Sequence, residues 1–311
     1  MQTVTVIGLG TMGHGIAQTF ALAGINVQMF DDQAATRNSV RGRIRHNIDI
    51  MSESGLLPDV DPDQVLERIS IFDNERAALD GSEMVTEAIV EDLDTKRALL
   101  KRCEDVVAAT TILASNTSSF PMTQIARDLK QPQRAINTHW FNPPHVIPVV
   151  EIIPGERTSV ETRKTVMALF KELGKQPVHI RHETPGFVLN RIQVAMFREM
   201  LDLIERGVIS AEDLDIAVKG SLGLRWAASG PMRVGDFGGW DVLGKVYQVL
   251  APDLKSGSQI PPLIEKMVDQ GKYGIKTGQG FFEYPAEQIP QIVADKDRRF
   301  MAWARLLAEM K

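Results

Sequence analysis

The chain has 311 residues, of which 43% are hydrophobic and 24% are charged. A chain of this size can bury a full core and form two domains of ordinary length. Its 40 acidic residues outnumber its 35 basic residues and leave a formal net charge of −5. No overall positive field would attract nucleic acid or an anionic membrane, so we expect neither as a partner.

Targeting and redox signals are few. The first residues run directly into an apolar segment without a basic leader, and no uninterrupted apolar run could cross a bilayer. We therefore expect a cytoplasmic protein. Cys103 is the single cysteine of the sequence, which excludes an internal disulfide and a cysteine-based metal cluster within one chain. We expect Cys103 to be a core residue of a helix, and nothing in the sequence calls for a metal.

Short β-rich runs alternate with longer segments of helical period from residue 3 to about residue 180. The β-rich runs are residues 3–7, 26–30, 83–89, 111–115, 134–140 and 177–180. Such alternation is typical of βαβ units, so it predicts an α/β domain with a mostly parallel sheet. The acidic stretch 52–64 predicts an excursion from this domain in which a loop joins two helices.

The sequence changes character after residues 181–187. Beyond this point the β-rich runs stop, and segments such as 191–208 and 261–271 place apolar residues at helical spacing. We therefore divide the chain into a first domain, residues 1–183, and an all-helical second domain, residues 184–311.

A glycine pattern follows the first predicted strand. Gly8, Gly10 and Gly13 fit G-x-G-x-x-G at the start of a predicted helix, and a second strand ends at Asp31. Glycines let the turn approach a pyrophosphate, and the acidic side chain accepts hydrogen bonds from the ribose hydroxyls. A tight turn with a strand-ending Asp31 is the alternative, but the complete order of elements favours a Rossmann-type dinucleotide site. Since the carboxylate would repel a 2′-phosphate, we expect NAD as the cofactor.

A cluster of polar residues ends the predicted strand 111–115. Its members are Ser115, Asn116, Thr117, Ser118 and Ser119. Ligands of doubly wound sheets bind beyond the carboxyl ends of the strands, which makes the cluster a candidate cleft lining. Alternatively, some of its members cap the helix expected near Pro121.

The stretch 138–153, THWFNPPHVIPVVEII, places a histidine and a glutamate in apolar surroundings. A strand ends at His139, and prolines 143, 144 and 148 then force a rigid path before Glu151 returns. A histidine that takes a proton from an alcohol, while a carboxylate holds its other nitrogen, is the arrangement of a general base. Taken alone, such a histidine would more often be structural. The upstream nucleotide motif favours the catalytic interpretation.

The sequence resembles the L-3-hydroxyacyl-CoA dehydrogenases over nearly its whole length. The likeness runs through VIGLGTMGHGIAQ, VTEAIVEDLDTK, ASNTSS, HWFNPP, VVEII, TPGFVLNR and GKYGIKTGQGFFEY. In that family the histidine of H-F/W-x-N-P and the glutamate of V-E-I/V form the catalytic pair, which implies these roles for His139 and Glu151. The resemblance also implies a small-molecule substrate, a homodimer formed through the second domain, and a place in fatty acid metabolism.

The same resemblance implies roles for four more residues. Ser118 would contact the reacting part of the substrate and the nicotinamide, and Asn190 would support the reacting oxygen. Glu87 and Lys276 would lie along the dinucleotide. On residue grounds alone, Asn190 could instead start a helix and Lys276 could be solvated.

Two positions near the first helices depart from the family pattern. Where CoA-using relatives carry a serine and a lysine for the nucleotide tail, this chain has Asn47 and Ser54. A row of arginines at helical spacing nearby could contact phosphates or form a solvated face. The row consists of Arg37, Arg41 and Arg45.

A third departure concerns the substrate. Where most members have a G-Y-P-M-G-P-like turn, this chain reads GLRWAASGPM. The LRW there resembles relatives that act on free hydroxy acids, namely carnitine dehydrogenase and the gulonate dehydrogenase λ-crystallin. The HWFNPPH stretch and the tail after GFFEYP resemble the pyridine-carboxylate dehydrogenases. Arg225 could then anchor a substrate carboxylate, because a guanidinium group binds planar anions in a bidentate way.

Three hypotheses on function stay open at this point. The first is NAD-dependent oxidation of an L-3-hydroxyacyl-CoA, such as 3-hydroxybutyryl-CoA, to the 3-keto product, with His139 as general base paired with Glu151. The second is the same chemistry on a free hydroxy acid held by Arg225. The third is a non-catalytic NAD-binding protein with a structural or sensing role, although such a role would not require the complete catalytic set.

Overall fold

The computed structural model describes residues 1–57 and 60–310. The chain divides into two compact units. The first contains residues 1–190 together with residues 297–311, and the second contains residues 191–296. The expected boundary at residue 183 thus lies close to the observed one, but the last residues of the chain belong to the first unit and not, as expected, to the second.

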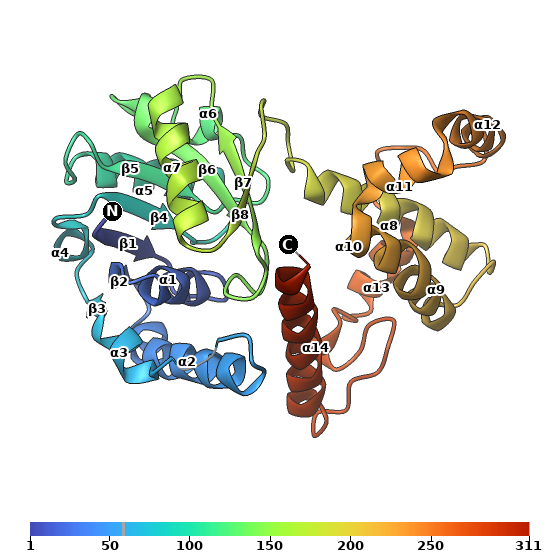
Figure 1. The fold of residues 1–311 in the computed structure, drawn as a ribbon, viewed down its shortest axis with the longest axis horizontal. Helices are drawn as coiled ribbons and strands as arrows, with labels where there is room; N and C mark the ends of the chain where they lie inside the picture. The colour runs from blue at the N-terminus through green and yellow to red at the C-terminus, as the bar shows by residue number, and fades with distance from the viewer. Residues whose placement is uncertain (58–59, 311) are drawn as a thin grey trace. The chain divides into compact units, whose positions relative to one another are not determined.

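The first unit is built on an eight-stranded sheet with the order β3-β2-β1-β4-β5-β6-β7-β8 (Figure 1). The strands are β1 (Thr3–Ile7), β2 (Asn26–Phe30), β3 (Ile69–Phe72), β4 (Met84–Glu87), β5 (Ile112–Ser115), β6 (Ala135–Trp140), β7 (Val149–Pro154) and β8 (Gln176–His179). Every pairing is parallel except that of β6 with β7. The predicted fold class, a mostly parallel Rossmann-type sheet followed by helices, is confirmed.

Helices cover both faces of this sheet, because each central strand sends alternate apolar side chains to opposite sides. On one face pack α1 (Gly13–Leu22), α2 (Ala34–Glu53), α3 (Pro62–Glu67) and α7 (Val160–Glu172). On the other face lie α4 (Glu75–Leu79), α5 (Leu93–Glu104) and α6 (Met122–Ile125). A 3₁₀ turn, Pro132–Arg134, leads into β6. Cys103 is fully buried on α5, as expected.

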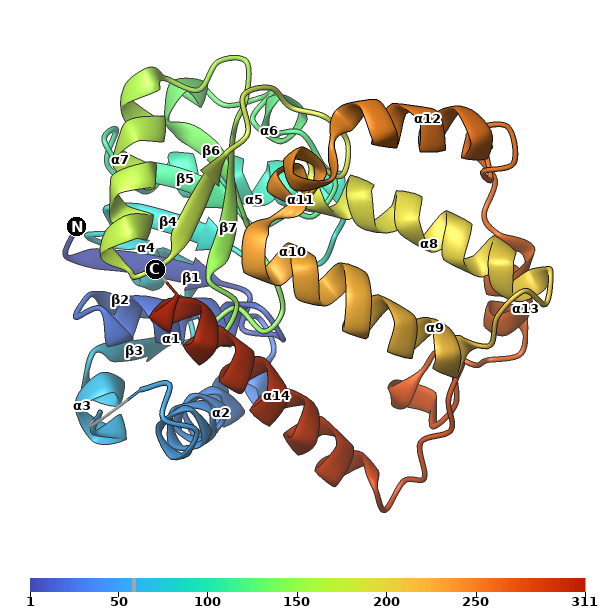
Figure 2. The ribbon, with the colours of Figure 1, turned by 45° about the vertical axis from the view of Figure 1, so that its right-hand side comes forward.

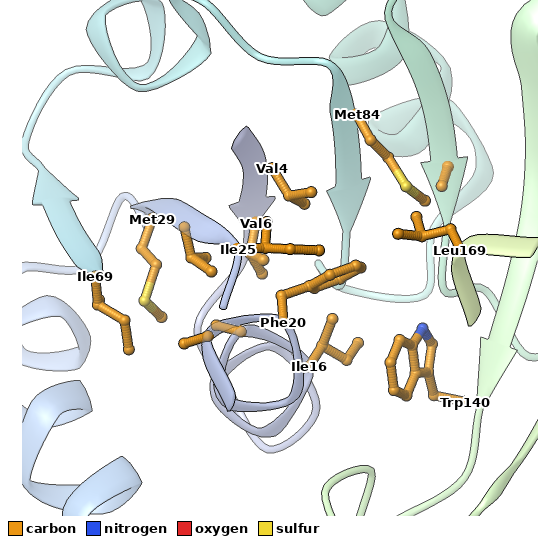
Figure 3. Packing of buried hydrophobic residues seen from close by; sticks show 14 of the residues in the cluster. Val4, Val6, Ile16, Phe20, Ile25, Met29, Ile69, Met84, Trp140 and Leu169 are labelled. Atoms are coloured by element: carbon orange, nitrogen blue, oxygen red, sulfur yellow. The ribbon is translucent and has the colours of Figure 1, made fainter. Parts of the chain in front are cut away.

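Mostly aliphatic side chains pack with the aromatic rings of Phe20 and Trp140 in the core between α1 and the sheet (Figure 3). The ring of Phe20 meets the rings of Trp140 and Phe170 edge-on, at centroid distances of 6.1 and 6.3 Å. Trp140 directly follows His139 on β6, so this packing fixes the end of the strand that carries the candidate base.

The second unit is helical, in agreement with the prediction (Figure 2). It contains α9 (Ala211–Ala217), a π-helical turn (Val218–Gly223), α10 (Leu224–Ser229), α11 (Pro231–Gly238), α12 (Trp240–Leu250), α13 (Pro262–Asp269) and a 3₁₀ turn (Ile275–Thr277). The long helix α8 (Leu189–Glu205) begins at the end of the first unit, and α14 (Ile289–Glu309) ends in the first unit.

The C-terminal part of α14 packs on the end of α2 (Figures 1 and 2). Met301 is 2% exposed and forms a small core with Met51 and Val146. The expected pair of helices joined by a loop is also present, since α2 ends at Glu53 and α3 begins at Pro62. Residues 58 and 59 of the loop lie outside the described residues. Among the described residues, no helix has the length and apolar character needed to cross a membrane.

Candidate active site

The glycine turn between β1 and α1 has the close packing that its sequence predicts. Gly8 adopts a φ of +88°, and a Cβ atom there would lie 2.7 Å from the carbonyl oxygen of Ala88. A Cβ atom at Gly13 would lie 1.7 Å from the carbonyl oxygen of Gly8, so the first turn of α1 requires a glycine. Gly10 differs, since a Cβ atom there would meet nothing within 4 Å. Gly8 and Gly13 therefore serve the fold, and Gly10 leaves room for a ligand.

Asp31 lies where the dinucleotide motif requires an acidic residue, directly after β2. Its Oδ2 atom accepts a hydrogen bond of 2.7 Å from the amide of Leu9, in the glycine turn. Asp31, Gly8 and Gly10 all line one pocket of about 440 Å³. This pocket fits the adenosine half of NAD, because it is lined by an acidic side chain and by a glycine turn with free space beside Gly10.

The arginines of α2 contact the protein itself. The Nη1 atom of Arg37 donates to the carbonyl oxygen of Asp31 at 2.6 Å, and Arg41 donates to the carbonyl oxygens of Leu66 and Ile69. Arg45 pairs with Asp63. The three arginines therefore stabilise the first unit through contacts within it. The geometry does not support the suggested contact of this row with phosphates.

Glu91 gathers the polar cluster that follows β5. Its Oε1 atom accepts hydrogen bonds from the backbone amides of Ser118 and Ser119 at 2.9 and 3.1 Å, and from the hydroxyl of Thr117 at 2.6 Å. Burial alone would raise the pKa of Glu91, but bonds from Ser119, Thr117 and Ser118 and the charge of Lys96 outweigh it and lower the pKa to about 2. The carboxylate is therefore charged at neutral pH and shapes the loop that presents Ser118.

Glu91 is a candidate site residue that was not predicted from the sequence. Its side chain is 37% exposed, and it borders the same pocket as His139 and Ser118. A signal was present in the sequence, because Glu91 stands just beyond the predicted strand 83–89, at the edge where ligands bind.

Glu87 does not have the place expected of it. Its side chain is 1% exposed and its Oε1 and Oε2 atoms lie 3.0 and 2.9 Å from the Nζ atom of Lys96. The hydroxyl of Ser115 and the amide of Ile89 complete its partners. A carboxylate so enclosed cannot contact a dinucleotide, so the expectation for Glu87 is corrected: this residue supports the neighbouring loop from within the core.

His139 and Glu151 meet as the sequence analysis predicts. They are a directly opposed pair in the antiparallel ladder of β6 and β7. The Nδ1 atom of His139 lies 2.8 Å from Oε2 of Glu151, and the two residues are 5% and 1% exposed. A carboxylate can only accept, so the neutral imidazole carries its hydrogen on Nδ1. This tautomer leaves the lone pair of Nε2 available to take a proton.

The second oxygen of Glu151 is also engaged. Its Oε1 atom accepts hydrogen bonds from the amides of Val188 and Leu189, at 3.2 and 3.0 Å, where α8 begins. A carboxylate at a helix start satisfies free amides and interacts favourably with the helix dipole. Both oxygens of Glu151 are thus fixed by partners on different elements.

Ser118 and Asn190 lie on the rim of the same pocket, which has a volume of about 470 Å³ and also contacts His139 and Glu91. The Nδ2 atom of Asn190 donates a 3.2 Å hydrogen bond to the carbonyl oxygen of Ser118. The structure therefore brings together the four residues expected to be catalytic. Hydroxyl, amide and imidazole groups around one hollow can hold an oxygen atom and receive its proton.

Two expected site residues belong to the second unit. Arg225 is exposed on α10, and its Nη2 atom donates a 3.2 Å hydrogen bond to the hydroxyl of Ser221. Lys276 is exposed as well, with its Nζ atom 5.2 Å from the ring centroid of Tyr273. Both side chains are positively charged and exposed, and their contacts within the second unit do not show whether either binds a ligand.

Asn47 and Ser54 both have partners within the first unit. Asn47 donates a 3.0 Å hydrogen bond to Oε1 of Gln18, and the hydroxyl of Ser54 donates to the carbonyl oxygen of Met51 at 2.8 Å. The carbonyl oxygen of Ser54 in turn accepts a hydrogen bond from Arg305 on α14. The end of α2 is therefore covered by the C-terminal helix.

Comparison with known families identifies both parts of the chain. The model described as "3-hydroxyacyl-CoA dehydrogenase, NAD binding domain" matches residues 3–184, and the one described as "3-hydroxyacyl-CoA dehydrogenase, C-terminal domain" matches residues 186–284. Helix α14 lies beyond the second match.

Two relatives illustrate the range of named activities. The 5-formyl-3-hydroxy-2-methylpyridine 4-carboxylate 5-dehydrogenase of Mesorhizobium japonicum is 33% identical over 99% of this chain and 98% of its own. A probable 3-hydroxybutyryl-CoA dehydrogenase of Bacillus subtilis is 36% identical over 91% of this chain and 98% of its own.

The similar solved structures include enzymes with the same two kinds of named substrate. The chain is similar to the crystal structure of the 5-formyl-3-hydroxy-2-methylpyridine 4-carboxylic acid 5-dehydrogenase, described as an NAD⁺-dependent dismutase, with a TM-score of 0.93, 33% identity and 99% of each chain covered. For (S)-3-hydroxybutyryl-CoA dehydrogenase from Ralstonia eutropha the TM-score is 0.75 and the identity 35%, with 92% of this chain and 99% of the other covered.

Proposed function

The chain belongs to the 3-hydroxyacyl-CoA dehydrogenase family and is an NAD-dependent oxidoreductase of CH–OH groups, and from this premise we propose that it oxidises a free hydroxy acid. The observation that carries the proposal is the packing of α14 on the end of α2. The family resemblance implies that CoA-using relatives hold the nucleotide tail with a serine and a lysine at the positions of Asn47 and Ser54. Here Ser54 lies beneath Arg305, and Asn47 is bonded to Gln18.

The comparisons support the same substrate class. The Mesorhizobium relative, whose named substrate is a pyridine carboxylate, aligns with 99% of the chain, whereas the Bacillus relative aligns with 91%. A free acid needs a cation to hold its carboxylate, and Arg225 is the proposed anchor. A guanidinium group without a carboxylate partner of its own suits this task, and the described contacts of Arg225 are with Ser221 alone.

The chemistry follows from the tautomer of His139. Its Nε2 atom removes the proton of the substrate hydroxyl, while Ser118 and Asn190 hold the oxygen from which the proton leaves. Glu151 stabilises the imidazolium that forms, because its charge lies against Nδ1. When bound, NAD supplies the acceptor for the hydride of the substrate carbon. Asp31 and the open turn at Gly10 would hold its adenosine and pyrophosphate parts, and Lys276 is proposed to lie along it.

The role of the pair is tested with His139→Gln and Glu151→Gln. We expect His139→Gln to lower kcat on the order of a hundredfold or more with NADH binding retained, since the proton acceptor is lost and the cofactor pocket is intact. Glu151→Gln should show a related loss. His179→Gln is a matched control, because His179 lies on β8 and bonds to Arg163. Near-normal turnover by His139→Gln would end the assignment.

The substrate is tested by NADH formation with free 3-hydroxy acids, with hydroxymethyl heteroaromatic carboxylates and with 3-hydroxybutyryl-CoA. We expect turnover of an acid and no competition from free coenzyme A. Arg225→Met should raise the KM for the acid at least about tenfold, because the carboxylate loses its partner. Arg233→Met, on α11, is the control for loss of an exposed positive charge. Efficient thioester turnover unaffected by Arg225→Met would refute the proposal.

Oxidation of a 3-hydroxyacyl-CoA is the second candidate. It is favoured by relatives named 3-hydroxybutyryl-CoA dehydrogenase, which are 35 to 37% identical over about nine tenths of the chain. The same assay separates the two candidates. Absence of turnover on every compound, together with tight NADH binding, would instead support a structural or sensing role.

We further propose a cytoplasmic homodimer formed through the second unit. Large apolar side chains of that unit are exposed within the chain, as expected of a surface that a second copy covers. Among them are Phe197, Phe237, Trp240, Tyr247 and Val249, with exposed fractions of 48 to 78%. Light scattering after size exclusion should give twice the mass of the chain, and a monomeric mass at micromolar concentration would contradict the proposal.

A further inference from the structure

The backbone just before α8 has an unusual conformation. Phe187 has a φ of +52°, and it is the one non-glycine residue with a positive φ in the part of the chain that the structure describes. Gly186 before it has a φ of +71°. This region is disfavoured for a bulky side chain, and an aromatic residue there persists only where its surroundings hold it in place.

The surroundings of Phe187 are apolar and close to the catalytic pair. Its side chain is fully buried and packs with Ile153 of β7 and with Ile180. Its ring centroid lies 5.4 Å from that of His139, and the two planes are inclined by 56°. The ring centroid of Phe141 lies 4.5 Å from that of the same imidazole. The imidazole therefore lies against two aromatic rings, which restrict its rotation about the Cβ–Cγ bond.

The left-handed turn also has a consequence for Glu151. The two amides that follow Phe187 are those of Val188 and Leu189, and both donate to Oε1 of Glu151. The Oε2 atom of the same carboxylate faces His139. One residue thus contacts the imidazole with its ring and directs two donors to the partner of that imidazole with its backbone.

We propose that Phe187 is a positioning residue of the catalytic pair. The inference rests on the proposed role of His139 as the base. A glycine would adopt the same φ without steric cost, so turn geometry alone gives no reason for a phenylalanine. The ring holds the imidazole plane with Nδ1 on the carboxylate and Nε2 toward the pocket. The backbone keeps that carboxylate from rotating away.

The direct test replaces the ring and keeps apolar volume. Phe187→Leu and the more flexible Phe187→Met should lower kcat about tenfold to a hundredfold with Kd for NADH within about twofold, because small misplacements of a reacting group are costly. Ile180→Ala is the matched control, since it removes volume from the same apolar cluster while the phenylalanine ring itself is kept. It should lower Tm and keep kcat within about threefold. Unchanged kcat in folded Phe187→Leu or Phe187→Met would overturn the inference.

A double mutant distinguishes positioning from general loss of structure. If Phe187 acts through His139, then Phe187→Leu should cause no further loss of kcat in a His139→Gln background. A loss that persists there would show that the ring supports something else, and the inference would fail. Near-normal turnover of His139→Gln alone would instead refute the proposed function, so the two failures are distinguishable.

A substrate-independent measurement completes the test. The proton that His139 Nδ1 donates to Glu151 should give a low-field resonance in the proton NMR spectrum, assigned by its absence in His139→Gln. We expect this signal to broaden or vanish in Phe187→Leu and to persist in Ile180→Ala. A sharp, unshifted signal in Phe187→Leu would contradict the proposed contact.

Discussion

Lys96 and Glu87 form an ion pair almost wholly removed from solvent, with Nζ 2.9 Å from Oε2 and each side chain 1% exposed. The Nζ atom also lies 3.3 Å from Oε2 of Glu91, the residue that accepts hydrogen bonds from residues 117–119 beside the candidate site. One buried cation therefore joins a structural carboxylate to a carboxylate of the site.

Replacement of Lys96 by methionine should destabilise the protein strongly. The substitution leaves the charge of Glu87 buried without a counter-ion, which costs about 3 to 5 kcal/mol in comparable cases. Urea unfolding measures the difference. Lys130→Met is the control, because its pair with Asp105 is exposed to solvent and should contribute little to the free energy of unfolding. Equal effects of the two substitutions would contradict the importance of burial.

Glu91 predicts an acid-dependent contribution to stability. Its folded-state pKa of about 2 lies below the ordinary value of 4.5, so the charged carboxylate stabilises the folded state. This stabilisation is complete above about pH 5 and is lost as the pH falls from about 4.5 towards about 2. The unfolding free energies of the wild type and Glu91→Gln should therefore converge between about pH 5 and pH 3. A difference that does not change over this range would refute the assignment.

The glycine turn offers a test that separates folding from cofactor binding. Gly13→Ala should destabilise the protein by about 2 kcal/mol or more, because the new Cβ atom would overlap the carbonyl oxygen of Gly8. The new methyl group of Gly10→Ala has no neighbouring atom within 4 Å, so the free energy of unfolding should stay within about 0.5 kcal/mol of the wild-type value. Its Kd for NADH should nevertheless rise at least about tenfold, since the methyl group enters the space of the pyrophosphate. Normal NADH binding by Gly10→Ala would contradict this placement.

Asp31 should determine the preference for NAD over NADP. Asp31→Ser removes the charge that repels a 2′-phosphate, so the ratio of kcat/KM values for the two cofactors should narrow or reverse. Asp32→Ser removes the same charge one residue later and should change the ratio less. Equal use of NADP by the unmutated enzyme would refute the prediction.

The sequence predicted the fold where several local signals agree. The strands that carry the glycine turn and His139 have β-rich runs bounded by turn residues, and their positions are confirmed. Strand β3 (Ile69–Phe72) was not predicted, because its short run was read as part of the segment between the expected strands 26–30 and 83–89. The assignment of residues 297–311 to the second domain was wrong, since the core around Met301 forms with residues distant in sequence.

The contact between His139 and Glu151 was predicted and Glu91 was missed for related physical reasons. His139 and Glu151 stand out as polar residues in an apolar stretch, whereas Glu91 is one of several acidic residues in a polar segment. Its place in the site comes from the hydrogen-bond donors of residues 117–119 that converge on it, and no local pattern reveals that convergence. Glu87 was mistaken for a ligand contact because sequence alone does not give its burial.

The opposed positions of His139 and Glu151 on two adjacent strands separate chemistry from recognition. Their distance is set by the spacing of an antiparallel ladder, which any pair of such strands provides. Residues 141–148 connect the two strands, and among them the ring of Phe141 lies against His139. Apart from Phe141 and the buried Val146, the connection can change in composition while the ladder keeps the two groups in register. The proposed proton chemistry of the pair therefore depends on the sheet, and changes in the rest of the connecting turn would leave its geometry in place.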